Sequence, residues 1–141
     1  MSSCKIRLFE KRDTDAIVKL ASDYAAFDRA MPKDWLLSTY DKHPKSIWVA
    51  EVNNELAGFI IGYETKTPMG TVWGNIELIA VHPRSRKRGI GTKLVEKILE
   101  QFKRANVEVA TLHCPATALE AKKLYEKFGF EVNAYHMRKK L

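Results

Sequence analysis

The chain has 141 residues, the length of one average domain, and its 24 Lys and Arg against 17 Asp and Glu give a net charge of +7. With 45% hydrophobic and 29% charged residues, the composition is that of a globular protein and excludes a disordered chain. The basic surplus favours anionic partners, such as nucleic acid, a phosphorylated cofactor or an acidic membrane, without choosing among them.

The first half of the chain predicts a strand, two helices and a hairpin. The strand is expected over Lys5–Phe9. From Asp13 onward apolar residues recur at helical spacing, and a second short helix or loop is expected over Pro32–His43, because proline suits a helix start. Two β-rich runs follow, joined by two asparagines that tolerate the positive φ of a tight turn. These three segments are Ser46–Val52, Asn53-Asn54 and Glu55–Glu64.

The second half predicts a buried strand followed by a β-α-β unit. The run Val72–Val81 ends in IELIAV, which is apolar enough for a strand covered on both faces. The next helix carries one apolar stripe. Its members are Gly91, Leu94, Val95, Ile98, Leu99 and Phe102. A strand over Val107–Leu112 leads to a last helix, which a capping box at Thr117–Glu120 starts and Gly129 ends. A short β-like tail is expected over Phe130–Leu141.

The expected elements follow the order β-α-α-β-β-β-α-β-α-β. Hairpin strands come first and a β-α-β crossover follows. This order predicts an α/β (α+β) fold with a mixed, mostly antiparallel central sheet flanked by helices. Because no linker or composition shift divides the chain, we expect a single domain over residues 1–141.

The two cysteines, Cys4 and Cys114, are too few for a disulfide framework and lack metal-ligand spacing, so we expect a reducing compartment and no metal. The N-terminal residues have no apolar core of signal-peptide length. The apolar stretches are far shorter than the ~20 residues of a membrane span. We therefore expect a cytoplasmic protein that spans no membrane.

The segment Ile79–Leu94, with the sequence IAVHPRSRKRGIGTKL, places a basic loop and a Gly-x-Gly between a buried strand and a helix start. A helix N-terminus offers free N–H donors and a positive dipole end, and glycine lets an anion approach the main chain. We therefore expect this loop to bind a pyrophosphate. Its residues are Arg86, Lys87, Arg88, Gly89, Ile90, Gly91 and Thr92.

Other phosphate motifs fit the loop less well. The chain contains no GxxxxGK[ST] string, and Leu94 stands where a dinucleotide-binding loop has its third glycine. The loop is also compatible with an ordinary basic turn before a helix. A third interpretation is a nucleic-acid patch, since Arg84 joins the same charge cluster. Spacing alone leaves these three interpretations open.

Two motifs resemble those of the GNAT superfamily of N-acetyltransferases. The string VHPRSRKRGIG is similar to its acetyl-coenzyme A signature, (Q/R)-x-x-G-x-(G/A), and AKKLYEKFGF is similar to its A-x-x-x-Y-x-x-x-G-F stretch. The positions that carry the two motifs are Arg86, Gly89, Gly91, Ala121, Tyr125, Gly129 and Phe130. The expected strand order matches too, so the resemblance covers nearly the whole chain. The chain departs from the family at Ala118, where an Asn is frequent.

The resemblance implies direct transfer of an acetyl group from acetyl-coenzyme A to a primary amine, without an acyl-enzyme. The acceptor would be a small molecule, a protein N-terminus or a lysine. The pantetheine of the coenzyme would bind the backbone of Ile79, Ala80 and Val81, and its pyrophosphate would bind the loop Arg86–Thr92. Tyr125 would donate a proton to the departing thiolate. The alternative for Tyr125 is a packed core residue on the apolar face of the last helix.

Glu77 is the candidate general base, because an ammonium must lose a proton before the amine attacks. Many similar enzymes place an acid in this strand, and strand alternation puts Glu77, Ile79 and Val81 on one face. A carboxylate among apolar neighbours is suited to proton transfer. The alternatives are a salt-bridged or edge Glu77 and a water relay. Some relatives place the acid two residues earlier, where this chain has Asn75.

Two other functions stay open beside N-acetyltransferase: a basic nucleic-acid-binding domain and a non-catalytic acyl-coenzyme A binder. For the enzyme we expect an amine substrate as partner, and neither nucleic acid nor a membrane. Only Glu131–Leu141 follow the Gly-Phe pair that ends the second motif. The acceptor pocket is therefore either open or completed by a second subunit, as in a homodimer.

Overall fold

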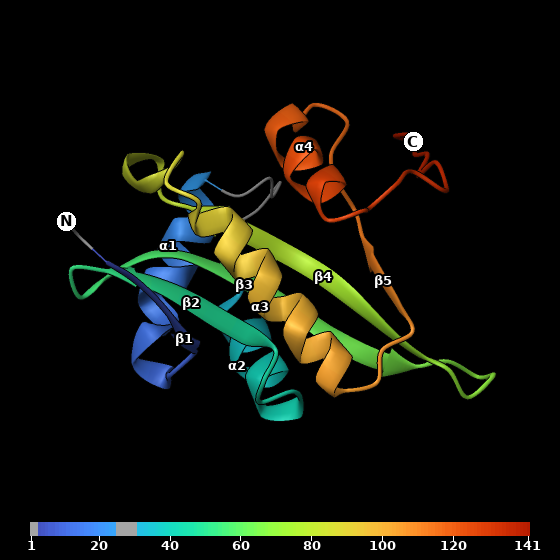
Figure 1. Ribbon diagram of the computed structural model, residues 1–141, viewed down its shortest axis with the longest axis horizontal. Coiled ribbons are helices and arrows are strands. Elements are labelled where there is room, and N and C mark those ends of the chain that lie inside the picture. Colours follow the sequence, from blue (N-terminus) through green and yellow to red (C-terminus); the bar gives the residue numbers. More distant parts are fainter. Residues whose placement is uncertain (1–2, 25–30) are drawn as a thin grey trace.

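The computed structural model describes residues 3–24 and 31–141. Within these ranges, five strands form one sheet in the order β1-β2-β3-β4-β5, antiparallel except for the parallel pair β4 and β5 (Figure 1). The strands are β1 (Cys4–Leu8), β2 (Ile47–Val52), β3 (Glu55–Lys66), β4 (Val72–Val81) and β5 (Val109–Leu112). The mixed, mostly antiparallel sheet predicted from the sequence is confirmed.

Helices cover both faces of the sheet. One face carries α3 (Ile90–Arg104), and the other carries α1 (Thr14–Tyr24) and α2 (Lys33–Lys42), while α4 (Leu119–Lys127) follows β5 (Figure 1). Short 3-10 turns precede α1 and α3. Two apolar clusters result, one on each face. The α1/α2 cluster includes Phe9, Ile17, Leu36, Phe59 and Ile61, and the α3 cluster includes Ile60, Ile76, Leu94, Ile98 and Tyr125.

The α3 helix lies close to the sheet because small residues face it there. A Cβ added at Gly74 would lie 2.8 Å from the ring of Phe102, and one at Gly62 would lie 2.9 Å from Ile98. Real Cβ atoms essentially never approach other atoms so closely. The predicted apolar stripe of α3 is confirmed, since its side chains fill the space left by these glycines.

The hairpin between β2 and β3 has the turn that its sequence predicts. Asn53 and Asn54 both have positive φ, 52° and 63°, as a two-residue hairpin turn requires. The end of α4 is also confirmed, with Gly129 at φ 89° and the N–H of Phe130 donating to the carbonyl of Tyr125 at 3.2 Å.

Two predictions near the C-terminal end were wrong. The α4 helix begins at Leu119 with Ala118 as its N-cap and no side-chain cap, so the predicted capping box at Thr117–Glu120 does not form. A backbone turn, in which the N–H of Ala118 donates to the carbonyl of Pro115, occupies the approach instead. The predicted β-like tail over Phe130–Leu141 contains no strand, and its residues after Phe130 are all exposed, so no buried face holds the tail in the sheet.

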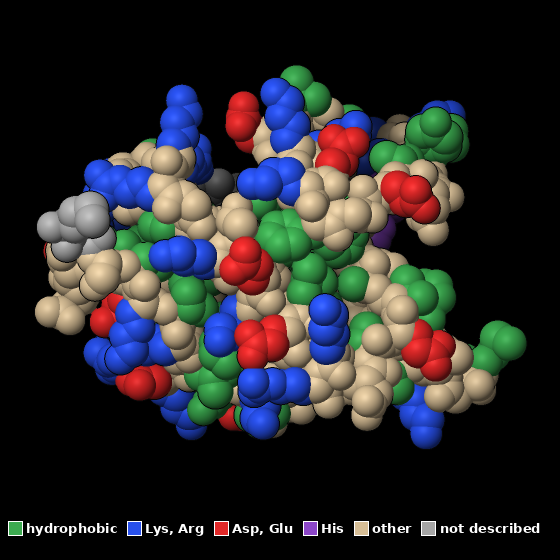
Figure 2. Space-filling model, viewed as in Figure 1, with side chains coloured by type: hydrophobic (Ala, Val, Ile, Leu, Met, Phe, Trp, Pro, Cys, Tyr) green, Lys and Arg blue, Asp and Glu red, His purple; other side chains and the backbone are tan. Residues whose placement is uncertain are grey.

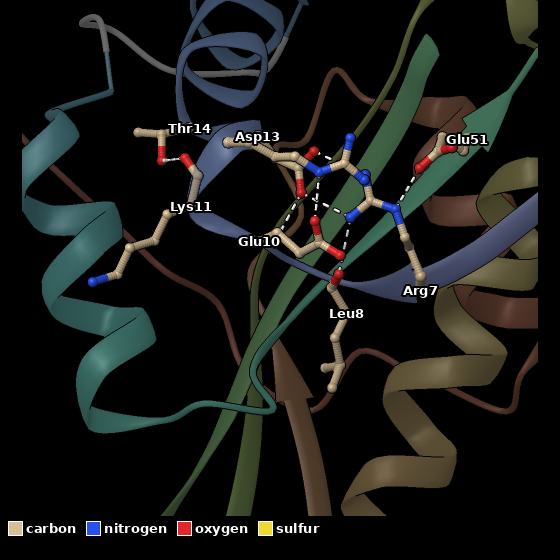
Figure 3. Close-up of polar contacts among 8 residues, drawn as sticks. Arg7, Leu8, Glu10, Lys11, Asp13, Thr14 and Glu51 are labelled. Atoms are coloured by element: carbon tan, nitrogen blue, oxygen red, sulfur yellow. Dashed lines mark hydrogen bonds and ion pairs between the residues drawn. The ribbon is translucent and has the colours of Figure 1, made fainter. Parts of the chain in front are cut away.

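An ion-pair network at Arg7 joins β1, β2 and the turn before α1 (Figure 3). The Arg7 guanidinium donates to both carboxylate oxygens of Asp13 at 2.8 Å and also to Glu51 of β2. Asp13 is 6% exposed, and its Oδ2 accepts from the N–H of Glu10 at 2.8 Å. Burial raises the pKa of Asp13, but the hydrogen bonds from Arg7 and Glu10 outweigh burial and hold it below its ordinary value.

The Arg7 network predicts a loss of stability on neutralising Asp13. Asp13→Asn removes a charged, bidentate partner and should lower the free energy of unfolding by about 2 kcal/mol at neutral pH. Because the folded pKa of Asp13 lies below its unfolded value, its contribution is complete above the unfolded value and disappears as pH falls through the folded one. Urea unfolding at several pH values measures both effects.

Asp15→Asn is the matched control, because Asp15 pairs with Lys33 at 3.0 Å on the surface and should contribute little. A gap between wild type and Asp13→Asn that stays constant from about pH 5 to about pH 2 would contradict this assignment.

Candidate active site

The parallel pair β4 and β5 separates halfway along β4. The two strands pair only from Trp73 opposite Val109 to Ile76 opposite Leu112. Beyond Ile76, β4 runs on to Val81 with β3 on one side only, and the two ribbons diverge (Figure 1). Among the described residues, the backbone groups of this stretch that point away from β3 therefore have no strand partner, and they form an edge that an extended chain can pair with.

This edge contains the three residues that the sequence assigned to a pantetheine. Ile79 and Val81 are half-buried and pack with the α3 cluster, whereas Ala80 is buried against the α1/α2 cluster. At the end of the strand, the Nε of Arg86 donates to the carbonyl of Val81 at 3.0 Å. Arg86 thus ties the basic loop to the open edge of β4.

The basic loop ends in a cluster of unpaired backbone donors at the start of α3. Gly89 is the N-cap with φ 76°, and Lys87 also has a positive φ of 63°. The first helical hydrogen bond runs from the N–H of Lys93 to the carbonyl of Gly89 at 3.1 Å. In the described part of the chain, no backbone carbonyl accepts from the N–H groups of residues 89–92. These donors, at the positive end of a 15-residue helix, suit an anion.

The two loop glycines have different roles. At Gly89 an added Cβ would meet nothing within 4 Å, so this position faces open space and needs glycine for its positive φ. At Gly91 an added Cβ would lie 3.2 Å from Leu124 of α4. The sequence predicted that both glycines let a phosphate approach. The structure instead places Gly91 against α4, and only Gly89 leaves the main chain open.

Basic side chains surround the loop. Lys and Arg side chains gather over it in Figure 2, at the upper left, and the surface is hollowed between this loop and α4. Lys87 and Arg88 are exposed, and Arg84 pairs with Glu55 at 2.7 Å. An open hollow of about 290 Å³ lies on the β3 side of β4, between the β2–β3 turn and the start of the loop, and it is lined by Arg84 and Arg88 among others. That hollow is on the wrong side of β4 to serve the opening toward β5.

The open strand edge and the helix start together fit the coenzyme that the sequence suggested. An extended amide-bearing arm matches a strand edge, and a diphosphate matches free N–H donors, an exposed glycine and basic side chains. Of the loop residues expected to bind it, Arg86 contacts the end of β4 and Gly89 to Thr92 form the start of α3, whereas Arg88 lines the hollow on the β3 side.

Tyr125 reaches the α3 face of the sheet from α4. It is 7% exposed and packs edge-on against Phe130, with ring centroids 5.8 Å apart. It belongs to the cluster that also contains Ile79 and Val81. Burial raises the pKa of Tyr125 to about 12, with a smaller contribution from Cys114. Its phenol therefore stays protonated at any physiological pH.

Glu77 lies on the opposite face, which corrects the prediction from strand alternation. Ile61 of β3 faces Leu78 and Gly62 faces Ile76, so Glu77 is the extra residue of a β-bulge. The bulge shifts the alternation by one residue, and Glu77 does not share the face of Ile79 and Val81. Its surroundings are polar rather than apolar: it is exposed, and its Oε1 accepts from Nδ2 of Asn75 at 2.6 Å.

The sequence reasoning missed the residues around Glu77. Tyr63 of β3 and Thr111 of β5 flank Asn75 directly across the sheet. The ring of Tyr63 stacks on His43, which follows α2, at 4.6 Å between centroids. These residues come from three strands, so only the pairing register of the sheet shows that they lie together. Strict alternation along β4 could not predict that register, because the bulge at Glu77 inserts one residue.

Comparisons with known proteins agree with the fold. The model of the acetyltransferase (GNAT) family matches residues 14–130, a range that includes the loop, Glu77 and Tyr125. An uncharacterized N-acetyltransferase of Methanocaldococcus jannaschii is 30% identical over 129 residues, 89% of this chain and 76% of that protein. An N-alpha-acetyltransferase of Sulfurisphaera tokodaii is 27% identical over 135 residues, 90% of this chain and 80% of that protein.

Among solved structures, Ard1 from Thermoplasma volcanium matches with a TM-score of 0.82 and 26% identity, over 93% of this chain and 84% of that one.

The geometry of the loop predicts that Gly89→Ala weakens coenzyme A binding. An alanine at φ 76° strains the backbone by about 1–2 kcal/mol, and its methyl group would extend into the open space beside the loop. We expect the Kd for coenzyme A to rise about tenfold or more, measured by calorimetry.

Gly70→Ala is the matched control, since Gly70 has a similar φ of 85°, also faces open space, and lies in the loop between β3 and β4. Both variants should lose similar stability. Equal Kd values for the two would show that the loop at Gly89 does not hold the coenzyme.

Proposed function

This chain belongs to the GNAT acetyltransferase family and transfers acetyl groups from acetyl-coenzyme A to amines, and on that premise we propose that its two substrates meet across the sheet. The coenzyme lies on the α3 side of the opening between β4 and β5, and the acceptor amine comes from the α1/α2 side. One observation carries this proposal: Tyr125 and Glu77 lie on opposite faces of the sheet, beside the place where the two strands part. We take the whole chain, residues 1–141, as one catalytic domain.

Acetyl-coenzyme A supplies the activated acetyl group as a thioester. The edge of β4 at Ile79, Ala80 and Val81, whose last carbonyl already accepts from Arg86, would bind its pantetheine. Arg86, Lys87, Arg88 and the N–H groups of residues 89–92 would bind its pyrophosphate. A backbone N–H of the same edge would stabilise the oxyanion that forms when the amine attacks. With the thioester and the amine both bound beside the end of β4, the reaction no longer depends on a chance encounter of two molecules in solution, which lowers its entropic cost.

Tyr125 acts on the leaving group chiefly as a hydrogen-bond donor. Its pKa of about 12 lies roughly 3.5 units above the ~8.5 of an alkyl thiol. Complete transfer of its proton to the thiolate would therefore be uphill by roughly 5 kcal/mol. A hydrogen bond from the neutral phenol stabilises the developing thiolate without that cost, and the proton can come later from solvent.

Glu77 acts as the base for the acceptor ammonium. It is exposed on the face of the sheet that is opposite to Tyr125, so an amine entering from that face meets the carboxylate first. The carboxylate can accept the ammonium proton directly or through one water. The amine then reaches the acetyl group through the opening.

We propose that the acceptor is the α-amino group of a peptide or protein. The support is the similarity to an N-alpha-acetyltransferase of Sulfurisphaera tokodaii and to Ard1. The alternative acceptor is a small-molecule amine. Family membership does not favour the nucleic-acid-binding alternative for the basic loop.

We place the enzyme in the cytoplasm. In the described ranges no helix is both long and apolar enough to cross a bilayer. Both cysteines, Cys4 and Cys114, are free thiols, which suits a reducing compartment.

An acceptor screen tests the proposed function. Free thiol released from acetyl-coenzyme A is measured with short peptides bearing a free N-terminus, with the same peptides blocked at the N-terminus but carrying lysine, and with polyamines and aminoglycosides. We expect release with the free N-terminus alone. Release with only the small amines would overturn the peptide assignment, and no release with any acceptor would overturn the proposed function.

Tyr125→Phe should lower kcat about ten- to a hundredfold while the Kd for coenzyme A stays within about twofold, because the hydroxyl is needed only as the thiolate develops. Stopped-flow thiol detection and calorimetry measure the two quantities. Tyr40→Phe is the control, since Tyr40 packs edge-on against Phe9 in the opposite cluster. An unchanged kcat would remove Tyr125 from the mechanism.

Glu77→Gln should abolish the acidic limb of the kcat/KM profile and lower kcat/KM about a hundredfold at neutral pH, since glutamine cannot accept the ammonium proton. The profile is recorded with saturating acetyl-coenzyme A. Glu64→Gln, at a neighbouring position of β3, is the control for a lost surface charge. A profile unchanged in shape and height would reject the base role.

A further inference from the structure

The outer edge of β5 has no strand partner within the described residues. The strand lies at one end of the sheet order, and its residues Val109–Leu112 pair with β4 on one side only. Folded proteins usually protect such an edge with a charge, a proline, a bulge or a covering segment. The sequence of β5, VATL, has neither charge nor proline and contains the β-branched Val109 and Thr111. This edge is therefore suited to pairing with another strand.

Large apolar side chains are exposed on β4 and β5 and on the tail, the segment after α4. On the strands, the exposed Trp73 lies opposite the exposed Val109. On the tail, Tyr135 and Met137 are 89% and 86% exposed, and Val132 is exposed as well. Figure 2 shows hydrophobic side chains along the right of the molecule, where β5 and the tail lie in Figure 1. Exposed apolar surface of this kind marks an interaction site.

The tail lies at the carboxyl end of β5 without pairing with it. The ring of His136 meets edge-on the ring of His113, the residue that directly follows β5, with 5.5 Å between their centroids. The tail as a whole extends away from the five strands (Figure 1), and its residues after Phe130 are exposed. Its sequence over residues 131–138, EVNAYHMR, includes β-prone residues and has neither proline nor glycine. A segment able to form a strand thus lies beside an open strand edge and does not occupy it.

We propose that two copies of this chain exchange their tails, so that each tail adds a strand to the open β5 edge of the other copy. Because the tail extends away from its own β5, it is free to pair with an edge that a second copy presents. The exchange is mutual, so a two-fold axis relates the two chains and the assembly closes as a dimer. It satisfies backbone groups of both tails and both edges and removes apolar tail side chains from water.

The charges at the two segments favour an antiparallel arrangement of tail and edge. Lys139 and Lys140 follow the apolar part of the tail, and the exposed Glu108 directly precedes β5. The N–H of Glu108 donates to the carbonyl of Val72 at 2.8 Å, which fixes its backbone at the start of the strand. In an antiparallel pair, the last residues of one strand lie beside the first residues of the other. The two lysines of one copy then lie beside Glu108 of the other, where opposite charges are favourable.

The first test measures the dimer by sedimentation velocity of the full chain at concentrations up to about 100 µM. Alternate N–H groups of a strand point to opposite sides, so Ala134→Pro combined with Tyr135→Pro removes one that faces β5 in any register. We expect the dimer Kd to rise about tenfold or more. The matched control, Ala134→Ser combined with Tyr135→Phe, keeps both N–H groups and should leave the Kd within about twofold of wild type. A wild-type chain that stays monomeric, or a dimer that the two prolines do not weaken, would overturn the proposal.

A charge exchange tests the orientation of the tail. Glu108→Lys places like charges side by side and should raise the dimer Kd about three- to tenfold. Adding Lys139→Glu and Lys140→Glu to the same chain restores opposite charges and should recover most of the lost affinity. Glu96→Lys, on the exposed surface of α3, is the control for the change in net charge alone. A triple variant as weak as Glu108→Lys would overturn the antiparallel exchange.

Hydrogen exchange measured by mass spectrometry shows which chain the tail pairs with. Protection of the amides of residues 109–112 and 132–138 should increase with protein concentration in parallel with the dimer fraction. Equal protection of both segments at every concentration, in a monomeric chain, would show that the tail pairs with its own β5 and would overturn the proposal. None of these measurements uses acetyl transfer, so their outcome is independent of the proposed function.

Discussion

Backbone hydrogen bonding between β4 and β5 stops after Ile76, and the site depends on that loss. A parallel strand normally satisfies the backbone groups along its neighbour, and groups left without partners must find them elsewhere. Here β3 satisfies one edge of β4 as far as Val81, while the other edge stays available. A sheet that remained fully paired would have no unpaired strand edge here for a substrate.

The β-bulge at Glu77, in the same part of β4, determines which face of the sheet carries the carboxylate. One extra residue moves the carboxylate to the α1/α2 face, while Ile79 and Val81 stay on the α3 face with Tyr125. The acidic and phenolic groups are therefore separated by the sheet itself. Each has its own environment, polar and exposed for Glu77, apolar and buried for Tyr125.

Much of the fold follows from local rules, and the remainder depends on long-range pairing. Asn53-Asn54, the stripe of α3 and Gly129 were predictable because turn chemistry and helical spacing are properties of short segments. The loop at Gly89 was predictable for the same reason. The face of Glu77 was not, because a single inserted residue reverses alternation and depends on β3. The tail after Phe130 was mispredicted because β propensity alone cannot supply a pairing partner.

The glycines beneath α3 limit which substitutions the sheet can accept. Gly62 and Gly74 leave no room for even a methyl group under Ile98 and Phe102, so the helix axis is fixed at its far end by shape. A larger residue at either position would push Ile98 or Phe102 away from the sheet. The tilt of α3 would then change, and the loop at Gly89, where α3 begins, would move with it. Replacement of glycine by alanine is a common route to greater thermal stability. At Gly62 of β3 and Gly74 of β4, however, the added methyl group would overlap α3, so the same replacement should destabilise the protein.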